Sequence, residues 1–141
     1  MLRILIVLLA VAGIVDAVLA LRVHYSDETE PCYVNEKWDC GIVNHSTYSQ
    51  IGRVPVAGIG GAGYLLLAAL AVAGRSVWTT GFSIAGEVYA LYLAHIERDV
   101  IHMWCLYCVI SLGIMSAIVI VAVIWTVMAS RNSKAQMLRT G

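Results

Sequence analysis

The sequence predicts an all-α integral membrane protein: a bundle of four transmembrane helices with a cysteine-bearing loop outside the membrane. Of the 141 residues, 60% are hydrophobic and only 13% are charged, whereas about one quarter of a soluble domain is charged. The mean hydropathy is correspondingly high, at +0.82. Four apolar stretches each approach the roughly 20 residues that a helix needs to cross a bilayer. We therefore expect a single membrane domain over residues 1–141.

The predicted spans cover residues 4–21, 54–73, 79–96 and 100–129. Each should be helical, because a backbone amide in lipid finds no partner outside its own segment. Pro55 falls in the first turn of the second span, where proline is tolerated because that position has no helical acceptor. Residues 22–53 form the only sizeable polar segment and are expected to be the catalytic outer loop.

The charged residues place both termini on the cytoplasmic side. Most acidic residues lie in the loop 22–53 and in the short loop near 97–100. Basic segments stay on the cytoplasmic side, so both loops are expected outside and the tail 130–141 inside. The net charge of zero gives no indication of a nucleic-acid partner. The basic residues assigned to the inside are Arg3, Arg75, Arg131, Lys134 and Arg139.

The first span has an alternative interpretation as a cleaved signal peptide. It has a basic start, an apolar run and small residues near its end, as such peptides do. Asp16 within the run and the length of the run favour a retained helix instead. Asp16 is expected to have a structural partner, because an ionisable group is costly inside a membrane.

The four cysteines form two pairs along the chain, and none is left over. Cys32 and Cys40 lie in the outer loop, and Cys105 and Cys108 lie in a Cys-Leu-Tyr-Cys motif at the outer end of the fourth span. All four are on the side where disulfides persist. Residues three apart share a helix face, and a disulfide between them is strained and therefore reducible.

This arrangement indicates thiol–disulfide exchange. Cys105 is expected in the first or second turn of its helix, where free amides favour a thiolate, and Arg98 or His102 could stabilise it further. A mobile loop pair could meet a soluble protein and then reach back to Cys105, so that two couples in series form an electron relay. The alternatives are two structural disulfides, a four-cysteine zinc site, which Cys-x7-Cys fits poorly, and free buried cysteines.

Two further motifs favour structural interpretations. The stretch Gly58-Ile59-Gly60-Gly61-Ala62-Gly63 matches the dinucleotide pattern but follows no strand, so close helix packing through small residues is preferred. Asn44-His45-Ser46 is a glycosylation sequon on the outer side, which we expect to be unmodified because a sugar would obstruct the loop.

The sequence resembles the vitamin K epoxide reductase family over nearly the whole chain, to about residue 129. The order and spacing of the matching features are specific in combination. They are Cys32 and Cys40, Ser46, the Gly-rich second span after Arg53-Val54-Pro55-Val56, and Trp104-Cys105-Leu106-Tyr107-Cys108. The resemblance implies a four-helix bundle enclosing a quinone pocket. The loop and a short amphipathic half-helix, over about residues 41–52, would cap this pocket.

The resemblance also implies a function. In the family, electrons pass from a thioredoxin-like protein to the loop cysteines, then to the Cys-x-x-Cys pair, then to a quinone. Carried over, Cys32 would accept electrons from the partner, Cys40 would exchange with Cys105, and Cys108 would be the thiolate that reduces the quinone. The quinone would be ubiquinone, menaquinone or a vitamin K-type naphthoquinone.

The partner and the location follow from the same resemblance. Many bacterial relatives carry a fused thioredoxin-like domain, for which this chain is too short. We therefore expect a prokaryotic-type homologue with a separate thioredoxin-like partner. It would be a multi-pass protein of a bacterial or archaeal cytoplasmic membrane, with its active cysteines outside.

Three residues are candidate quinone contacts. Ser46 corresponds to a family position near the active site, and Trp104 flanks the motif, although aromatic residues at this depth are also ordinary membrane anchors. Glu87, near the middle of the third span, could assist quinone protonation or bond a ring oxygen. It could equally be a carboxyl paired with Tyr89, Tyr92 or a backbone group. The histidines lack metal-ligand spacing, so no metal site is expected.

Two departures bear on the substrate. Animal members of the family have a substrate-binding Tyr four residues after the second motif cysteine, where this chain has Leu112. They also have an Asn near the start of the second span, where this chain has Val54, Pro55 and Val56. These departures favour disulfide formation in exported proteins. The alternatives are a reductase of vitamin K quinone or its epoxide, and a non-enzymatic, disulfide-stapled membrane scaffold.

Overall fold

The computed structural model describes residues 1–25 and 35–140. Its four long helices are α1 (Leu2–Tyr25), α3 (Val56–Val72), α4 (Ser76–Ile96) and α5 (Leu106–Thr140). Shorter elements lie between α1 and α3: α2 (Cys40–Asn44), the 3-10 turn η1 (Thr47–Ser49) and the paired strands β1 (Gln50–Ile51) and β2 (Val54–Pro55). A π-helical turn, η2 (Glu97–Ile101), continues α4. The predicted helical class is confirmed.

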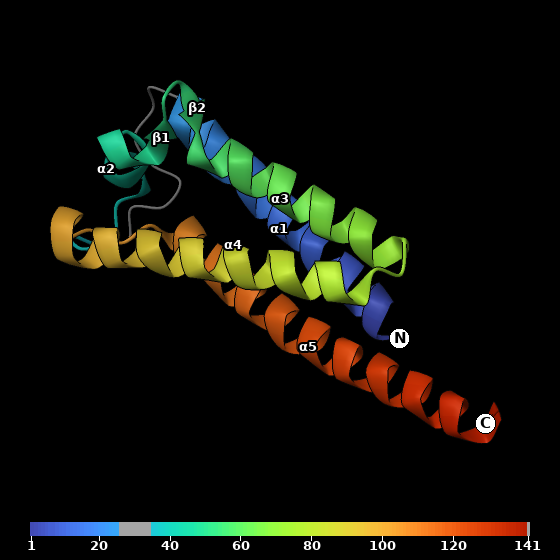
Figure 1. Ribbon diagram of the computed structural model, residues 1–141. Coiled ribbons are helices and arrows are strands. Elements are labelled where there is room, and N and C mark those ends of the chain that lie inside the picture. Colours follow the sequence, from blue (N-terminus) through green and yellow to red (C-terminus); the bar gives the residue numbers. More distant parts are fainter. Residues whose placement is uncertain (26–34, 141) are drawn as a thin grey trace.

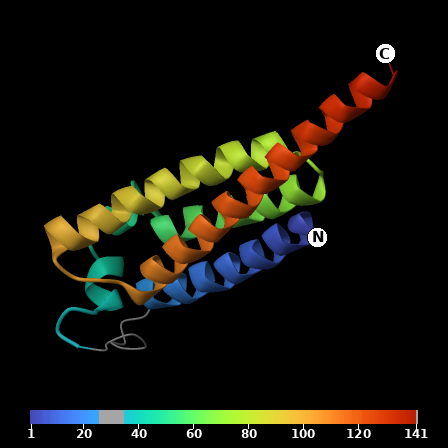
Figure 2. The same ribbon diagram turned by 90° about the horizontal axis from the view of Figure 1, so that it is seen from below.

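The two ends of the bundle differ. Figure 1 shows α2, β1 and β2 together at one end, and the N-terminus of α1 and the C-terminus of α5 at the other. Figure 2, turned by 90°, shows the same separation, with α5 extending beyond the other helices at the terminal end. The cysteine-bearing segment and both termini are therefore at opposite ends, as the predicted topology requires.

Two helices in the described part of the chain are long and apolar enough to cross a membrane: Leu2–Tyr25 and Leu106–Arg139. The helix Val56–Val72 is apolar but shorter. α4 has the length, but hydroxyl residues and Glu87 along it reduce its hydropathy. The four predicted spans thus correspond to four helices, of which two meet the criterion of length and composition on their own.

Several predicted boundaries shift. The second helix begins at Val56, because Val54 and Pro55 pair with β1 and Pro55 precedes the first turn. The fourth helix begins at Leu106, not at residue 100, because the chain bends at His102, whose φ is 58°. It also continues to Thr140, because no proline interrupts it and its last turns are rich in good helix formers. The tail predicted as a short solvated end is an exposed helix.

Tyr64 links three of the helices at the centre of the bundle. Its ring is buried in a cluster formed by α1, α3 and α5. The Tyr64 hydroxyl donates to the Ser111 carbonyl at 2.9 Å and lies 2.8 Å from the Ser111 Oγ. A Cβ at Gly13 would come within 2.5 Å of the Tyr64 ring, so only glycine fits opposite it. This contact sets the position of α5 one turn beyond Cys108.

Arg3 closes the terminal end of the bundle. Its Nε donates to the Ala71 carbonyl at 3.0 Å, and a second guanidinium nitrogen donates to the Val72 carbonyl. The guanidinium also lies 5.9 Å from the centre of the Trp125 ring. A cation at the last carbonyls of α3 is favourable, because those groups have no helical donors.

Candidate active site

Two backbone hydrogen bonds join the cysteine-bearing segments. The Asp39 amide donates to the Trp104 carbonyl at 3.1 Å, and the Trp104 amide donates to the Lys37 carbonyl at 2.9 Å. The rings of Trp38 and Trp104 pack beside this bridge, 6.2 Å apart. Cys40 and Cys105 each directly follow a bridged residue, so the bridge aligns the loop with the Cys-x-x-Cys motif.

Cys40 and Cys105 are buried in the same apolar cluster, with exposed fractions of 2% and 0%. Asn44 spans the two: its Nδ2 donates to the Cys40 carbonyl at 2.9 Å and lies 3.6 Å from the Cys105 sulfur. Cys40 is disulfide-bonded. Its predicted partner, Cys32, lies outside the described residues.

Cys105 and Cys108 are free thiols. Cys105 directly precedes α5, and its carbonyl accepts from the Val109 amide at 3.1 Å. A hydrogen bond with the Cys108 thiol, reinforced by the amides of Cys108 and Tyr107, lowers the pKa of the Cys105 thiol. The predicted acidic thiol at a helix start is therefore present, one residue before the first turn.

The charges expected to stabilise this thiolate lie elsewhere. Arg98 is exposed beside Asp99, with 3.9 Å between its Nε and an Asp99 oxygen, and His102 contacts the Arg98 carbonyl. The prediction that Arg98 or His102 would stabilise Cys105 is thus wrong. The η2 turn directs both side chains into solvent and turns Glu97 inward.

Glu97 is the ionisable group that meets both motif cysteines. Only 3% of the residue is exposed. Its Oε2 accepts from the Cys105 amide at 3.1 Å, and the residue lines the same cavity as Cys108. Burial raises the pKa of Glu97, and the hydrogen bonds with Cys108 and Cys105 lower it in part.

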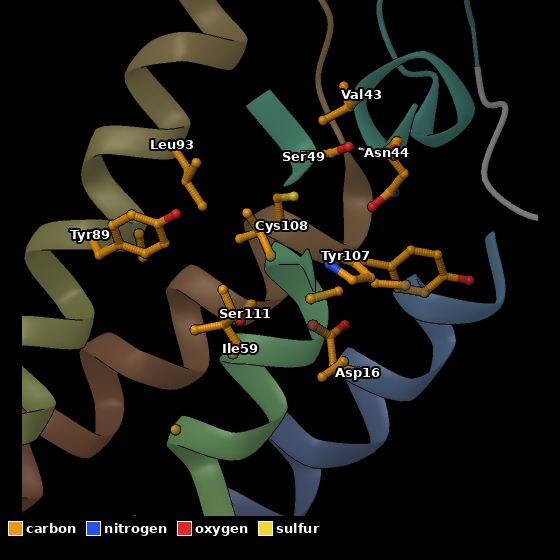
Figure 3. Close-up of a pocket in the computed structure, with 18 of the residues that line it drawn as sticks. Asp16, Val43, Asn44, Ser49, Ile59, Tyr89, Leu93, Tyr107, Cys108 and Ser111 are labelled. Atoms are coloured by element: carbon orange, nitrogen blue, oxygen red, sulfur yellow. Dashed lines mark hydrogen bonds between the residues drawn. The ribbon is translucent and has the colours of Figure 1, made fainter. Parts of the chain in front are cut away.

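A cavity of about 330 Å³ lies beneath the loop, with Cys108 in its wall. Figure 3 shows Tyr89 and Leu93 reaching it from α4, Asp16 from α1 and Asn44 from α2. The volume is within the range of small-molecule sites, about 300–1,000 Å³. Glu97 also lines this cavity, and no Lys or Arg of residues 1–25 and 35–140 does.

The segment over the cavity is shorter and more irregular than the half-helix predicted for residues 41–52. It consists of α2, η1 and the β1–β2 hairpin. Asp39 caps α2 by accepting from the Ile42 amide at 3.1 Å. The Asn44 carbonyl accepts from the Ser49 hydroxyl at 2.6 Å and contacts His24 Nδ1 of α1. Tight turns through polar residues replace a continuous helix here.

The three predicted quinone contacts have different positions. Ser46 lines the cavity, with its hydroxyl donating to the Val43 carbonyl at 2.8 Å. Trp104 is not among the lining residues and packs on Trp38 instead. Glu87 is also absent from the cavity wall: its Oε1 accepts from Ser116 at 2.7 Å. The tyrosine and backbone partners considered for Glu87 are therefore not its partners among the described residues.

Three residues at the site were not predicted to be there. Glu97 was assigned to the outer charged loop, and only its spacing from Cys105 could have indicated the contact. Asn44 was considered only as a sequon, yet it is 7% exposed and held between the two cysteine segments. Asp16 was expected to have a structural partner. It is 7% exposed, lines the cavity and has no hydrogen-bond or ion-pair partner among the described residues.

The alternatives for the cysteines can be compared with this geometry. Two structural disulfides do not fit, because Cys105 and Cys108 are free. Within residues 1–25 and 35–140, no group of three His, Cys, Asp or Glu side chains could hold a metal ion.

Comparison with known families gives one match: the family model described as "Vitamin K epoxide reductase family" matches residues 4–123. Comparison with curated proteins yields no match.

Proposed function

The chain belongs to the vitamin K epoxide reductase family, and on that premise we propose that it is a quinone-dependent thiol–disulfide oxidoreductase. Membership makes it a membrane oxidoreductase with redox-active cysteines. The proposal adds the direction of electron flow. Electrons pass from a separate thioredoxin-like protein through Cys32 and Cys40 to Cys105 and Cys108, and then to a membrane quinone, so that exported proteins acquire disulfides.

One observation carries this proposal: the two motif cysteines face different neighbours. Cys105 is buried in the same cluster as Cys40 and does not line the cavity, whereas Cys108 packs at the edge of that cluster and is also in the wall of the cavity. A disulfide that forms between Cys105 and Cys108 can therefore receive electrons on one side and release them on the other. A Cys105–Cys108 pair with a purely structural role would need neither the Cys40 cluster nor the cavity beside it.

The cavity fits a quinone ring. Most of its lining residues are apolar, and the polar ones include Cys108, Asn44 and the unpartnered Asp16. A bound quinone supplies an acceptor for two electrons and two protons. Cys108 would be the thiol beside it, and a protonated Asp16 would donate a hydrogen bond to one of its oxygens in place of the Tyr or Asn of the animal enzymes.

The membrane arrangement that we propose has all four long helices spanning the bilayer and both termini in the cytoplasm. The opposite ends of the bundle support it, because the start of α1, which carries Arg3, lies at the terminal end and α2, which begins at Cys40, lies at the other. The cysteines would then be on the oxidising side of a bacterial or archaeal cytoplasmic membrane, where disulfides persist.

The test uses purified full-length protein, reduced thioredoxin as the electron donor and menadione as a soluble quinone. We expect the wild type to consume menadione and to oxidise thioredoxin in equal amounts. Cys108→Ser should reduce the rate to that of the uncatalysed reaction. Equal rates for the wild type and the Cys108→Ser protein would contradict the proposal. Reduction of vitamin K epoxide with no menadione reduction would instead favour the reverse physiological role.

A further inference from the structure

The two motif thiols have different means of losing a proton. The Cys105 sulfur is hydrogen-bonded to the Cys108 thiol and to the amides of Tyr107 and Cys108 at the start of α5. Amides at a helix start stabilise a thiolate. Cys108, one turn later, is in contact with the Cys105 thiol and with the carboxyl of Glu97. A neighbouring carboxylate disfavours a thiolate because the two charges repel, but it can accept the proton that the thiol loses.

Glu97 is held firmly in this position. Its carbonyl accepts from the Met103 amide at 3.1 Å while its Oε2 accepts from the Cys105 amide, also at 3.1 Å. The two bonds fix both ends of the residue across the bend between η2 and α5. The π-helical turn of η2 places Glu97 inward, whereas Arg98 and Asp99 are exposed. Its carboxyl is thus held at the start of α5, beside the cavity that Cys108 also lines.

We propose that Glu97 is the proton carrier of the Cys-x-x-Cys pair: it accepts the proton of the Cys108 thiol on oxidation and supplies a proton to the Cys108 thiolate on reduction. This inference rests on the proposed function, since it assigns a role within that electron relay. It makes Glu97 a residue that acts on the reacting sulfur directly.

The proton and electron balance is as follows. Oxidation of the dithiol breaks the two S–H bonds, forms one S–S bond between Cys105 and Cys108, and releases two electrons and two protons. Both electrons and both protons are taken up by the quinone as it becomes a quinol, and Glu97 holds the Cys108 proton in transit. In the other half-reaction the Cys40 thiolate attacks the Cys105 sulfur. The electron pair of the broken bond stays on Cys108, and Glu97, carrying the proton that the Cys40 thiol gave up, protonates it. The Cys32 thiolate then attacks the Cys40 sulfur, which closes the Cys32–Cys40 disulfide and releases Cys105, and the proton of Cys32 passes to Cys105.

Apart from Cys105, no other titratable group near Glu97 is in a position to exchange a proton with Cys108 among the described residues. The titratable side chains that line the same cavity from the elements around it are Asp16, His24, Tyr48, Tyr64, Tyr89 and Tyr107. Near Glu97 in the sequence, His95 at the end of α4 and Arg98 in η2 are exposed, and each contacts the exposed Asp99. None of these groups has a hydrogen bond to Cys108 among the described residues.

The first experiment measures the Cys108 thiol without quinone or partner. In full-length Cys105→Ser protein, the rate of iodoacetamide alkylation at Cys108 is followed against pH by mass spectrometry. Replacement of Glu97 by Gln should lower the midpoint by about one unit or more, because a like charge next to the thiol is lost. In a protein with all four cysteines, the same replacement should reduce menadione turnover about 100-fold, the usual size of general acid–base catalysis.

The opposite signs of these effects are the signature of proton transfer: more thiolate but slower turnover. Asp99→Asn is the matched control, because it removes an exposed carboxylate from the same turn, and it should change neither quantity. An unchanged alkylation midpoint in Glu97→Gln would overturn the proposal, and so would turnover that rises with the thiolate fraction. If wild-type protein lacks menadione turnover but the midpoint shifts, the proposed function fails and the thiol–carboxyl contact stands.

A second measurement needs no stable Glu97→Gln protein. Infrared difference spectra of wild-type protein, between the Cys105/Cys108 dithiol and disulfide forms, report protonation of carboxyl groups. We expect a carboxylic-acid band that changes with the redox state and that shifts in Glu97→Asp. A spectrum without any carboxylic-acid change would overturn the proposal.

Discussion

The Asp39 amide donates to the Trp104 carbonyl at 3.1 Å, and this bond joins the residues that directly precede Cys40 and Cys105. It therefore sets the register between two segments that are more than sixty positions apart in the sequence. A sulfur-to-sulfur transfer requires such alignment, because disulfide geometry allows only a narrow range of Cα separations. The bridge supports the proposed exchange between Cys40 and Cys105.

The first prediction is a trapped Cys40–Cys105 bond. Protein carrying Cys32→Ser and Cys108→Ser retains only these two cysteines, and we expect mild oxidation to link them. Cyanogen bromide cleaves after Met103, which lies between them in the sequence, so a linked pair holds the two fragments together until reduction. Mass spectrometry under non-reducing conditions measures the linked fraction.

The matched control carries Cys32→Ser and Cys105→Ser, leaving Cys40 and Cys108. Because Cys105 is a buried member of the Cys40 cluster, whereas Cys108 packs only at its edge and lines the cavity, we expect much less linkage in the control. Equal linkage in the two proteins would show that the Asp39–Trp104 bridge does not direct Cys40 to Cys105 in preference to Cys108.

The second prediction concerns the cap of α2. Asp39 Oδ1 accepts from the Ile42 amide, and α2 has only five residues. Asp39→Ala should destabilise the folded loop by about 1 kcal/mol, the usual effect of losing a helix cap, and should slow formation of the Cys40–Cys105 bond. Asp39→Ser keeps a capping oxygen and should behave like the parent protein. Thiol-trapping kinetics in the two-cysteine background provide the measurement, and equal rates for Ala and Ser would contradict this role.

The third prediction tests the packing of Tyr64 on Gly13. A methyl group at Gly13 would meet the ring within 2.5 Å, and overpacking of this kind costs about 1–3 kcal/mol. Gly13→Ala should therefore lower the thermal unfolding midpoint in detergent. Gly113→Ala is the control, because nothing lies within 4 Å of a Cβ there and alanine favours a helix. Its midpoint should be equal to or higher than that of the wild type.

Much of the helical framework could be predicted from the sequence, because lipid forces the backbone of a long apolar stretch into a helix. The start of α5 could not be predicted. Residues 100–105 are mostly apolar and lead directly into the helix that follows, and the end of α4 depends on a π-helical turn and on the left-handed backbone of His102. Hydropathy records neither of these features.

In the site, too, local features could be predicted from the sequence and contacts between distant segments could not. The spacing of Cys105 and Cys108 is local and predicts reactive thiols, whereas the partners of those thiols come from distant segments. Glu97 lies eight residues before Cys105, and its inward orientation results from the fold of η2. The side chains of Arg98 and His102 were better candidates by charge alone. Only the bend at His102 explains why the acid, and not the bases, reaches the sulfurs.

The fourth prediction is a pH dependence of stability due to Glu97. Burial raises the pKa of Glu97 above its ordinary value of 4.5, so the folded protein binds this proton more tightly than the unfolded chain. Stability from this group is complete below pH 4.5 and is lost as pH rises through the folded pKa. The unfolding midpoint of wild type minus that of Glu97→Gln should therefore fall as pH rises above about 4.5. Thermal unfolding at a series of pH values measures the difference, and a rising difference would contradict the assignment.

The fifth prediction separates two roles for Asp16. A buried carboxyl without a partner costs desolvation energy, so Asp16→Leu should leave the unfolding midpoint unchanged or raise it. If the carboxyl hydrogen-bonds a quinone oxygen, the same change should raise the KM for menadione about fivefold, corresponding to the roughly 1 kcal/mol of one hydrogen bond. Asp16→Asn can still donate a hydrogen bond and should have a smaller effect on KM.

The Cys40–Cys105 linkage serves as the internal reference for Asp16, because it depends on the loop register and not on the cavity. It should be the same in the Leu, Asn and parent proteins. A lower unfolding midpoint with an unchanged KM in Asp16→Leu would assign Asp16 a structural role. That result would leave Tyr89 as a polar candidate in the cavity wall for contact with the ring oxygens.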